Sequence, residues 1–134
     1  MLYEEITKKI LESCFEVSNE LGIGYLESVY EKSLLVALRQ KGLKAERQIP
    51  LQVKFRGEVV GEFFVDILVE DKILIELKVS NSLTKENYAQ TINYLKTTNI
   101  EVGLLVNFGT PKIEYRRFSN QFLEKTENLK DFFK

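Results

Sequence analysis

Three ionisable side chains that could do chemistry lie close together along the chain: Asp66, Glu76 and Lys78. The chain contains no histidine, which excludes Ser-His-Asp and Cys-His catalysis and His-ligated zinc. Acid–base or metal chemistry must therefore come from Asp, Glu, Lys or Tyr side chains. Carboxylate oxygens are hard ligands, so a metal bound here would be Mg²⁺ or Mn²⁺ rather than zinc.

The stretch that carries these residues, Gly61 to Ser80, predicts two β-strands joined by a short turn at 70–72. Apolar side chains occupy the odd positions of both strands, which predicts that one face of the hairpin is core. These side chains are Phe63, Val65, Ile67, Val69, Ile73, Ile75, Leu77 and Val79. A three-residue loop places Asp66 directly opposite Glu76. A two-residue loop at 71–72 would shift the register and remove this pairing.

Two carboxylates placed opposite each other repel and destabilise a strand pair. A divalent cation bound between Asp66 and Glu76 would offset the repulsion, and so would a raised pKa on one of the two. Lys78 follows Glu76 by two residues and therefore shares its strand face. The alternative for these three residues is a structural cluster of lysine and carboxylates.

The elements that must position these residues follow from hydrophobic periodicity and from cap and turn residues. Helices are expected at 2–21, 26–41, 85–98 and 121–134, and further strands at 45–55, 101–109 and 113–118. Pro50 cannot donate to a ladder, so its strand lies at a sheet edge or starts at Leu51. The apolar run 101–109 is typical of a strand buried on both faces, parallel to the strand that carries Glu76.

Several motifs in this order resemble the PD-(D/E)XK nuclease superfamily. Asp66 followed by Glu76-Leu77-Lys78 is similar to its D…ExK core, and Gln90 to Tyr94 is similar to the QxxxY motif of the RecB-like branch. The segment GYLESVY, from Gly24 to Tyr30, resembles the name-giving motif of the GxxExxY family, a small-domain branch of the superfamily. The chain departs from that family at Ile23, where Pro is usual, and at Ser18, where many relatives have His.

The resemblance implies an α/β (α+β) fold with a restriction-endonuclease-like αβββαβ core. In such a core, helices flank a central mixed sheet. The first helix, the last strand and the last helix of this chain would be additions to it. A length of 134 residues fits one domain over 1–134.

The resemblance also implies a metal site and a catalytic set. Asp66 and Glu76 would bind Mg²⁺ or Mn²⁺, with help from Glu27 and the backbone carbonyl of Leu77. Lys78 would position the attacking water or stabilise the transition state. We favour this role over a general base, because two neighbouring carboxylates raise the pKa of a lysine.

Further residues would contact the substrate. Gln90 would point at the carboxylates as part of the catalytic set, and Tyr94 would reach a substrate phosphate. Tyr30 follows Glu27 along the same helix stripe, and Arg116 and Arg117 are candidates for phosphate contact. The alternative for the arginines is a solvated sheet edge. Gln48 is also open, between a polar group facing the site and a side chain facing solvent.

Three functions remain open from the sequence. The first is a metal-dependent nuclease that cuts DNA, with RNA less favoured as substrate. The second is a nucleic-acid-binding or accessory domain that needs a partner protein for activity. It is favoured by the net charge of −1, because DNA binders normally carry a basic surface. The third is an interaction module with a vestigial site.

Location and assembly follow from composition. No apolar run is long enough to span a membrane, and the N-terminus lacks the layout of a signal peptide. The single cysteine, Cys14, fits a reducing compartment and a small core side chain, so we expect a cytoplasmic protein. A homodimer is compatible with cutting two strands, but nothing in the sequence demands one.

Overall fold

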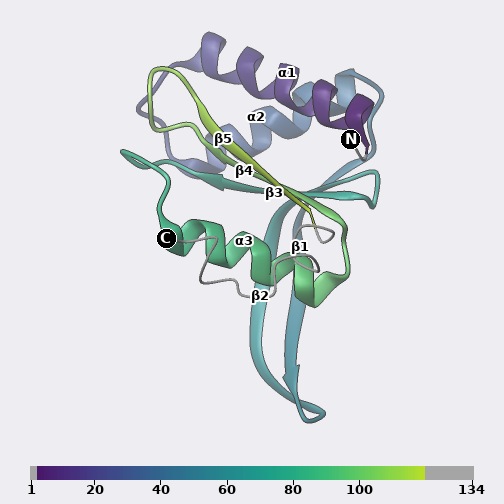
Figure 1. Ribbon diagram of the computed structural model, residues 1–134. Coiled ribbons are helices and arrows are strands. Elements are labelled where there is room, and N and C mark those ends of the chain that lie inside the picture. The colour runs from purple at the N-terminus through teal and green to yellow at the C-terminus, as the bar shows by residue number, and fades with distance from the viewer. Residues whose placement is uncertain (1–2, 120–134) are drawn as a thin grey trace.

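The computed structural model describes residues 3–119, which form a five-stranded sheet with helices on both faces (Figure 1). The elements are α1 (Glu4–Leu21), α2 (Glu27–Gln40), β1 (Ala45–Phe55), β2 (Glu58–Val69), β3 (Ile73–Lys78), α3 (Lys85–Thr98), β4 (Val102–Asn107) and β5 (Glu114–Ser119). The predicted α+β fold with a mixed sheet is confirmed. The helix expected at 121–134 lies outside the described residues.

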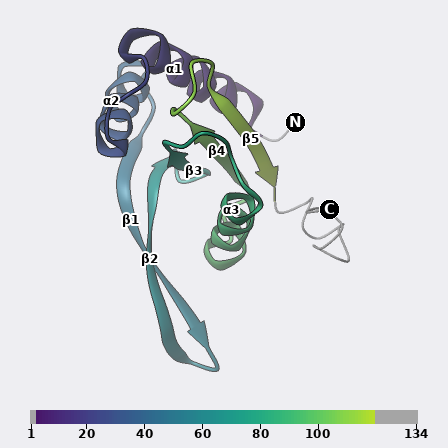
Figure 2. The same cartoon turned by 90° about the vertical axis from the view of Figure 1, so that its left-hand side faces the viewer.

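The strands lie side by side in chain order. Within residues 3–119, only β3 and β4 run parallel, and the other three neighbouring pairs are antiparallel. Helices α1 and α2 cover one face of the sheet and α3 covers the other (Figure 2). Pro50 lies in the edge strand β1, as predicted, although that strand begins at Ala45 rather than at Leu51.

The central strand β3 is buried on both faces, so the core extends beyond the one face that the odd positions predict. Ile73, Ile75 and Leu77 join the apolar cluster beneath α1 and α2. Leu74, on the other face, is equally buried and packs with α3. Cys14 also lies in the first cluster, and burial raises its pKa to about 12, as befits a core side chain rather than a reactive thiol.

The turn between β2 and β3 has the register that a three-residue loop predicts. Glu70 and Asp71 adopt positive φ angles of 53° and 56°, and the amide N of Lys72 donates to Val69 O at 3.0 Å. The paired residues are Val69 with Ile73, Leu68 with Leu74 and Ile67 with Ile75. This register brings Asp66 and Glu76 to the same level of the sheet.

Strands β1 and β2 continue past the rest of the sheet as a two-stranded arm (Figures 1 and 2). A bulge between Val53 and Lys54 interrupts their pairing. Phe63 was expected in the core, but it lies on this arm and is 41% exposed. The arm extends beyond the helices that bury the other strands, so its apolar side chains remain accessible.

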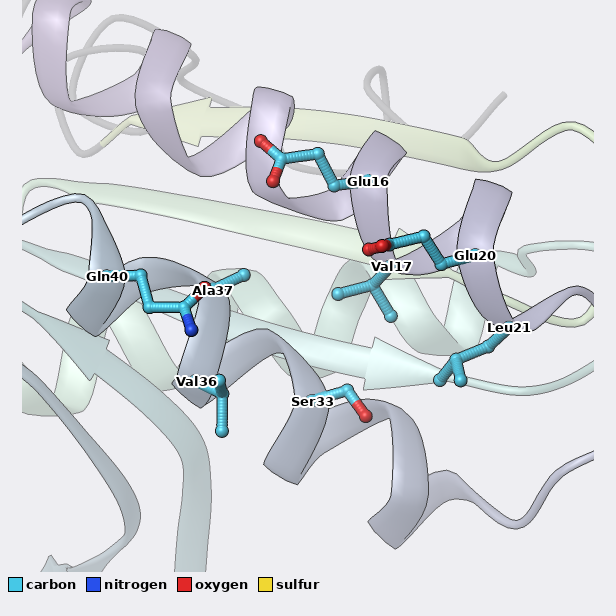
Figure 3. A pocket seen from close by; sticks show the side chains of 8 residues that line it. All are labelled: Glu16, Val17, Glu20, Leu21, Ser33, Val36, Ala37 and Gln40. Atoms are coloured by element: carbon cyan, nitrogen blue, oxygen red, sulfur yellow. The ribbon is translucent and has the colours of Figure 1, made fainter.

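A hollow of about 340 Å³ separates parts of α1 and α2 (Figure 3). It is lined by Glu16, Val17, Glu20, Leu21, Ser33, Val36, Ala37 and Gln40. None of these is a predicted site residue. Within residues 3–119, no helix is long and apolar enough to cross a membrane.

Candidate active site

The pairing of β2 with β3 ends just before Asp66 and Glu76. The ladder ends at Ile67 and Ile75, and beyond it side chains take over the pairing of backbone amides. The amide N of Asp66 donates to Glu76 Oε1 at 3.1 Å, and the amide N of Leu77 donates to Asp66 Oδ2 at 2.8 Å. Each carboxylate thus satisfies an N–H group of the opposite strand. Asp66 and Glu76 are adjacent, as the predicted register requires.

Burial makes negative charge costly at this pair. Burial, followed by the neighbouring charge of Asp66, raises the pKa of Glu76 from 4.5 to about 9. Burial also raises the pKa of Asp66, while the amide of Leu77 opposes the shift. The pair therefore holds a proton at neutral pH when no cation is bound.

Glu27 lies in the first turn of α2, near the pair. Burial raises its pKa, and the charge of Asp66 is the next cause. The helix N-terminus tolerates this extra carboxylate because the helix dipole favours negative charge there. Glu27 is therefore placed in the electrostatic field of the carboxylates, as its predicted role requires.

A further carboxylate, Glu31, was missed by the sequence reasoning. It is 3% exposed, and Gln48 Nε2 donates to both of its oxygens at 3.0 Å. The same amide nitrogen reaches Asp66 Oδ1 at 3.4 Å, and Arg47 Nε donates to Glu31 Oε1 at 2.9 Å. Gln48 thus faces the site rather than solvent. The available signal was a carboxylate inside the apolar stripe of α2, four residues after Glu27.

Lys78 is connected to the motif on α3. Its Nζ donates to Gln90 Oε1 at 3.0 Å, and Gln90 Nε2 donates to Tyr94 Oη at 3.2 Å. Burial raises the pKa of Tyr94, followed by the charges of Glu76 and Asp66. The structure therefore brings Lys78, Gln90 and Tyr94 together beside the carboxylates.

The end of β3 is clamped to β4 by Asn107, which is fully buried. Its Oδ1 accepts from the amide N of Ser80 at 3.0 Å and of Gly109 at 2.9 Å. Its Nδ2 donates to Ser80 O and to Glu114 Oε1, both at 3.0 Å. A Cβ on Gly109 would lie 2.4 Å from the backbone of Ser80. This close approach fixes the chain just after Lys78.

The prediction that Tyr30 binds substrate is wrong. Tyr30 is fully buried and its ring stacks on Phe108 at a centroid distance of 5.1 Å. Its Oη donates to Gly22 O at 2.6 Å and accepts from the amide N of Tyr25 at 3.3 Å. Tyr30 belongs to the apolar stripe of α2, which faces the core. Tyr30 therefore holds the loop before α2.

The contact of Arg116 and Arg117 with phosphate stays a prediction, but the structure separates the two side chains. Successive residues of a strand point to opposite sheet faces, so these two side chains cannot share a phosphate. Arg116 pairs with Leu105, the β4 neighbour of Glu76, and its guanidinium lies 5.0 Å from the ring centre of Tyr88 on α3. Arg117 belongs to the face covered by α1 and α2.

The possible metal ligands at this site are carboxylate oxygens. Within residues 3–119, no three His, Cys, Asp or Glu side chains converge as a metal cluster. Mg²⁺ nevertheless is commonly held by one or two carboxylates, with waters and substrate phosphates as its other ligands. The hard oxygens of Asp66 and Glu76 fit that pattern. The contribution of Glu27 and of the Leu77 carbonyl stays a prediction.

Comparisons with known proteins bear on the family and the fold of the chain. A family model described as the PD-(D/E)XK nuclease superfamily matches residues 4–118. Among solved structures, the chain is similar to one titled "Crystal structure of SSO0001", with 21% identity and a TM-score of 0.55. The match covers 87% of this chain and 59% of that one, and at this identity it supports the fold alone. The comparison with curated proteins found no match. Because the family model covers most of its length, the chain belongs to the PD-(D/E)XK nuclease superfamily.

Proposed function

We propose that the protein is a metal-dependent nuclease that hydrolyses phosphodiester bonds, with DNA favoured over RNA as substrate. The observation that carries this proposal is the adjacent pair of half-buried Asp66 and buried Glu76, with Lys78 two residues further on. A buried carboxylate pair needs a proton or a cation to offset its repulsion. Membership in a nuclease superfamily makes the cation the better-supported partner.

Asp66 and Glu76 would hold Mg²⁺ or Mn²⁺, with Glu27 and the Leu77 carbonyl as further ligands. When bound, such a cation supplies a nucleophile at neutral pH and offsets negative charge on the scissile phosphate. Lys78 would stabilise the charge that develops on the phosphate, because its ammonium is held in place by Gln90. Gln90 is in turn oriented by Tyr94.

The first test is a cleavage assay on labelled single-stranded and duplex DNA and on RNA, with Mg²⁺ or Mn²⁺. Lys78→Ala should slow cleavage by about 10²- to 10³-fold, the usual effect of removing one electrostatic donor. Asp66→Ala and Glu76→Ala should abolish it. Asp71→Asn is the matched control, because Asp71 is an exposed carboxylate at the turn of the same hairpin. Full activity of Asp66→Ala would contradict the proposal.

Calorimetric titration of Mn²⁺ into the wild type and Asp66→Ala tests the metal separately. Stoichiometric binding that is lost in the variant supports the Asp66–Glu76 site. Binding that persists unchanged in the variant would place the metal elsewhere and remove the basis of the mechanism.

The second candidate is a nucleic-acid-binding or accessory domain that is inactive alone. The net charge of −1 favours it, because a bare catalytic core without a basic surface binds nucleic acid weakly. It predicts weak, salt-sensitive binding without cleavage in Mn²⁺, and activity only when a partner protein is added. A homodimer would provide two sites for cutting both strands of a duplex. Analytical ultracentrifugation of the protein alone would test whether it forms.

We also propose that the chain belongs to the GxxExxY branch. Each residue of the motif has a distinct local role that supports the assignment. Gly24 adopts a φ of 114°, which side chains rarely tolerate. Glu27 lies near the carboxylates, and Tyr30 ties down the preceding loop. A cytoplasmic location remains a prediction.

A further inference from the structure

A groove of about 600 Å³ lies between the arm and α3, which sits beside the arm where it leaves the sheet (Figures 1 and 2). Val53 and Phe63 form its arm side, and α3 supplies Glu86, Ala89, Gln90, Asn93, Tyr94, Lys96 and Thr97. Its volume falls within the range of about 300–1,000 Å³ that is typical of ligand pockets.

Phe63 presents an accessible aromatic ring to this groove. The side chain is 41% exposed, and its centroid lies 5.9 Å from that of Tyr94 at a tilt of 49°. Gly61 leaves room for the ring, because a Cβ at that position would come within 2.9 Å of Phe63 Cε2. The ring therefore lies along the arm over a residue that has no side chain.

The groove is continuous with the candidate active site. Gln90 and Tyr94 line the groove, and Gln90 also accepts a hydrogen bond from Lys78 at 3.0 Å. The pKa of Tyr94 responds to the charges of Glu76 and Asp66. A ligand in the groove is thus adjacent to the group that would contact the scissile phosphate.

The lining chemistry favours a flat, neutral ligand with polar edges. Glu86 and Lys96 are its two charged residues, and they balance each other, so the groove has no excess positive charge for a phosphate. Phe63 offers an aromatic face, while Gln90 and Asn93 offer amide donors and acceptors. A nucleobase has this combination of a π-face and hydrogen-bonding edges.

We propose that the groove binds an unpaired nucleotide next to the scissile phosphate, with its base stacked on Phe63. This proposal rests on the proposed nuclease function and deepens it by naming the substrate class. The faces of paired bases inside a duplex are covered by their stacked neighbours, whereas unpaired bases can be splayed onto aromatic side chains. The substrate is therefore a single strand or an unpaired end or flap.

The test measures binding of a fluorescein-labelled ten-nucleotide oligothymidylate by anisotropy in EDTA, which separates binding from cleavage. The wild type should bind this single strand more tightly than a blunt DNA hairpin. Phe63→Ala should weaken binding by about 5- to 150-fold, the fold-change that corresponds to loss of one stacked base. Phe63→Leu should weaken it similarly although it keeps an apolar side chain, and Phe63→Tyr should retain it.

Phe64→Ala is the matched control. Phe64 is 56% exposed and follows Phe63 directly, so it points to the opposite face of the arm. Its replacement should leave affinity unchanged. Equal effects of Phe63→Ala and Phe64→Ala, equal affinity for hairpin and single strand, or no measurable single-strand binding would each overturn the proposal. Thermal melting of each variant confirms that it is folded.

Gly61→Ala supplies a variant that keeps the aromatic ring. Its Cβ would displace Phe63, so single-strand affinity should fall although Phe63 is present. Cleavage is scored separately in Mn²⁺. Cleavage that does not depend on Phe63 or on whether the substrate is single-stranded would overturn the proposed role of the groove but support the nuclease function. Binding that depends on Phe63 without any cleavage would overturn the nuclease function but support the role of the groove.

Discussion

At the residue scale, the candidate site is a pair of carboxyl groups whose simultaneous ionisation is unfavourable, because burial raises the pKa of both. Asp66 and Glu76 each accept a backbone amide of the other strand, which holds them together in spite of their repulsion. Such a pair binds either a proton or a cation, so pH and divalent metals should compete for it.

Glu76→Gln tests this competition through stability. The pKa of Glu76 in the folded protein is raised from 4.5 to about 9, so between these values the folded state binds more protons than the unfolded state. The free energy of unfolding should therefore fall as pH rises through this window, with a slope on the order of 1 kcal/mol per pH unit. Urea unfolding in EDTA at pH 5, 7 and 9 measures it.

The Gln variant should show a flatter profile and should be more stable than the wild type at pH 9. Glu58→Gln, at an exposed carboxylate of the arm, should leave the profile unchanged. A wild-type stability that rises between pH 5 and 9 would contradict the buried, protonated pair.

Tyr30→Phe distinguishes a core residue from a substrate contact. The variant keeps the stacked ring and loses the hydrogen bonds to Gly22 and Tyr25. The free energy of unfolding should fall by about 1 kcal/mol, while KM and single-strand affinity stay unchanged. A raised KM with unchanged stability would restore the substrate role that the sequence suggested.

At the element scale, the site depends on how β3 is held between its neighbours. β2 diverges from β3 at the carboxylates, but β4 stays paired with β3 as far as Lys78 and Asn107. The parallel partner therefore supports the catalytic end of β3, and Asn107 extends this support into the loop that follows.

Asn107→Ala should lower the free energy of unfolding by about 1–3 kcal/mol or more, because it leaves buried backbone groups of Ser80 and Gly109 without partners. Gly109→Ala should also destabilise, since its Cβ meets the backbone of Ser80 rather than a movable side chain. Urea unfolding measures both. Thr110→Ala, in an exposed turn hydrogen bond of the same loop, should change stability by less than either.

At the scale of the whole molecule, a net charge of −1 is combined with a site that would act on a polyanion. Affinity must then come from a few local cations and from base stacking rather than from a basic surface. The projecting arm and α3 supply a surface for base stacking, because α1 and α2 cover the opposite face of the sheet (Figure 2).

The salt dependence of single-strand affinity measures how many cationic side chains contact the nucleic acid. With about three contacts, such as Lys78, Lys96 and Arg116, the plot of log affinity against log salt for a single strand should have a slope of about −2. Lys96→Ala should reduce its magnitude by roughly 0.7. Lys8→Ala, at an exposed lysine of α1, is the control and should leave the slope unchanged. A slope of about −5 or steeper would indicate an extensive basic interface instead.

Strand register and helix bounds could be predicted from the sequence, because they depend on residues that are close together along the chain. Alternating apolar residues and a three-residue loop determined the register of β2 and β3, and with it the adjacency of Asp66 and Glu76. Thr84 caps α3 through the amide N of Asn87, and that helix has the predicted bounds. These outcomes follow from strand periodicity and from a capping side chain, which act within a few residues.

Other features were decided only by the tertiary structure. The side of α2 that faces the sheet buries Tyr30 and brings Glu31 to Gln48 and Asp66. The pairing of β5 with β4 places Arg116 and Arg117 on opposite faces of the sheet. The projection of the arm from the sheet leaves Phe63 41% exposed beside α3. Each depends on which distant element covers which face. Local periodicity identifies a residue's side of its own element, but only long-range packing determines what that side contacts.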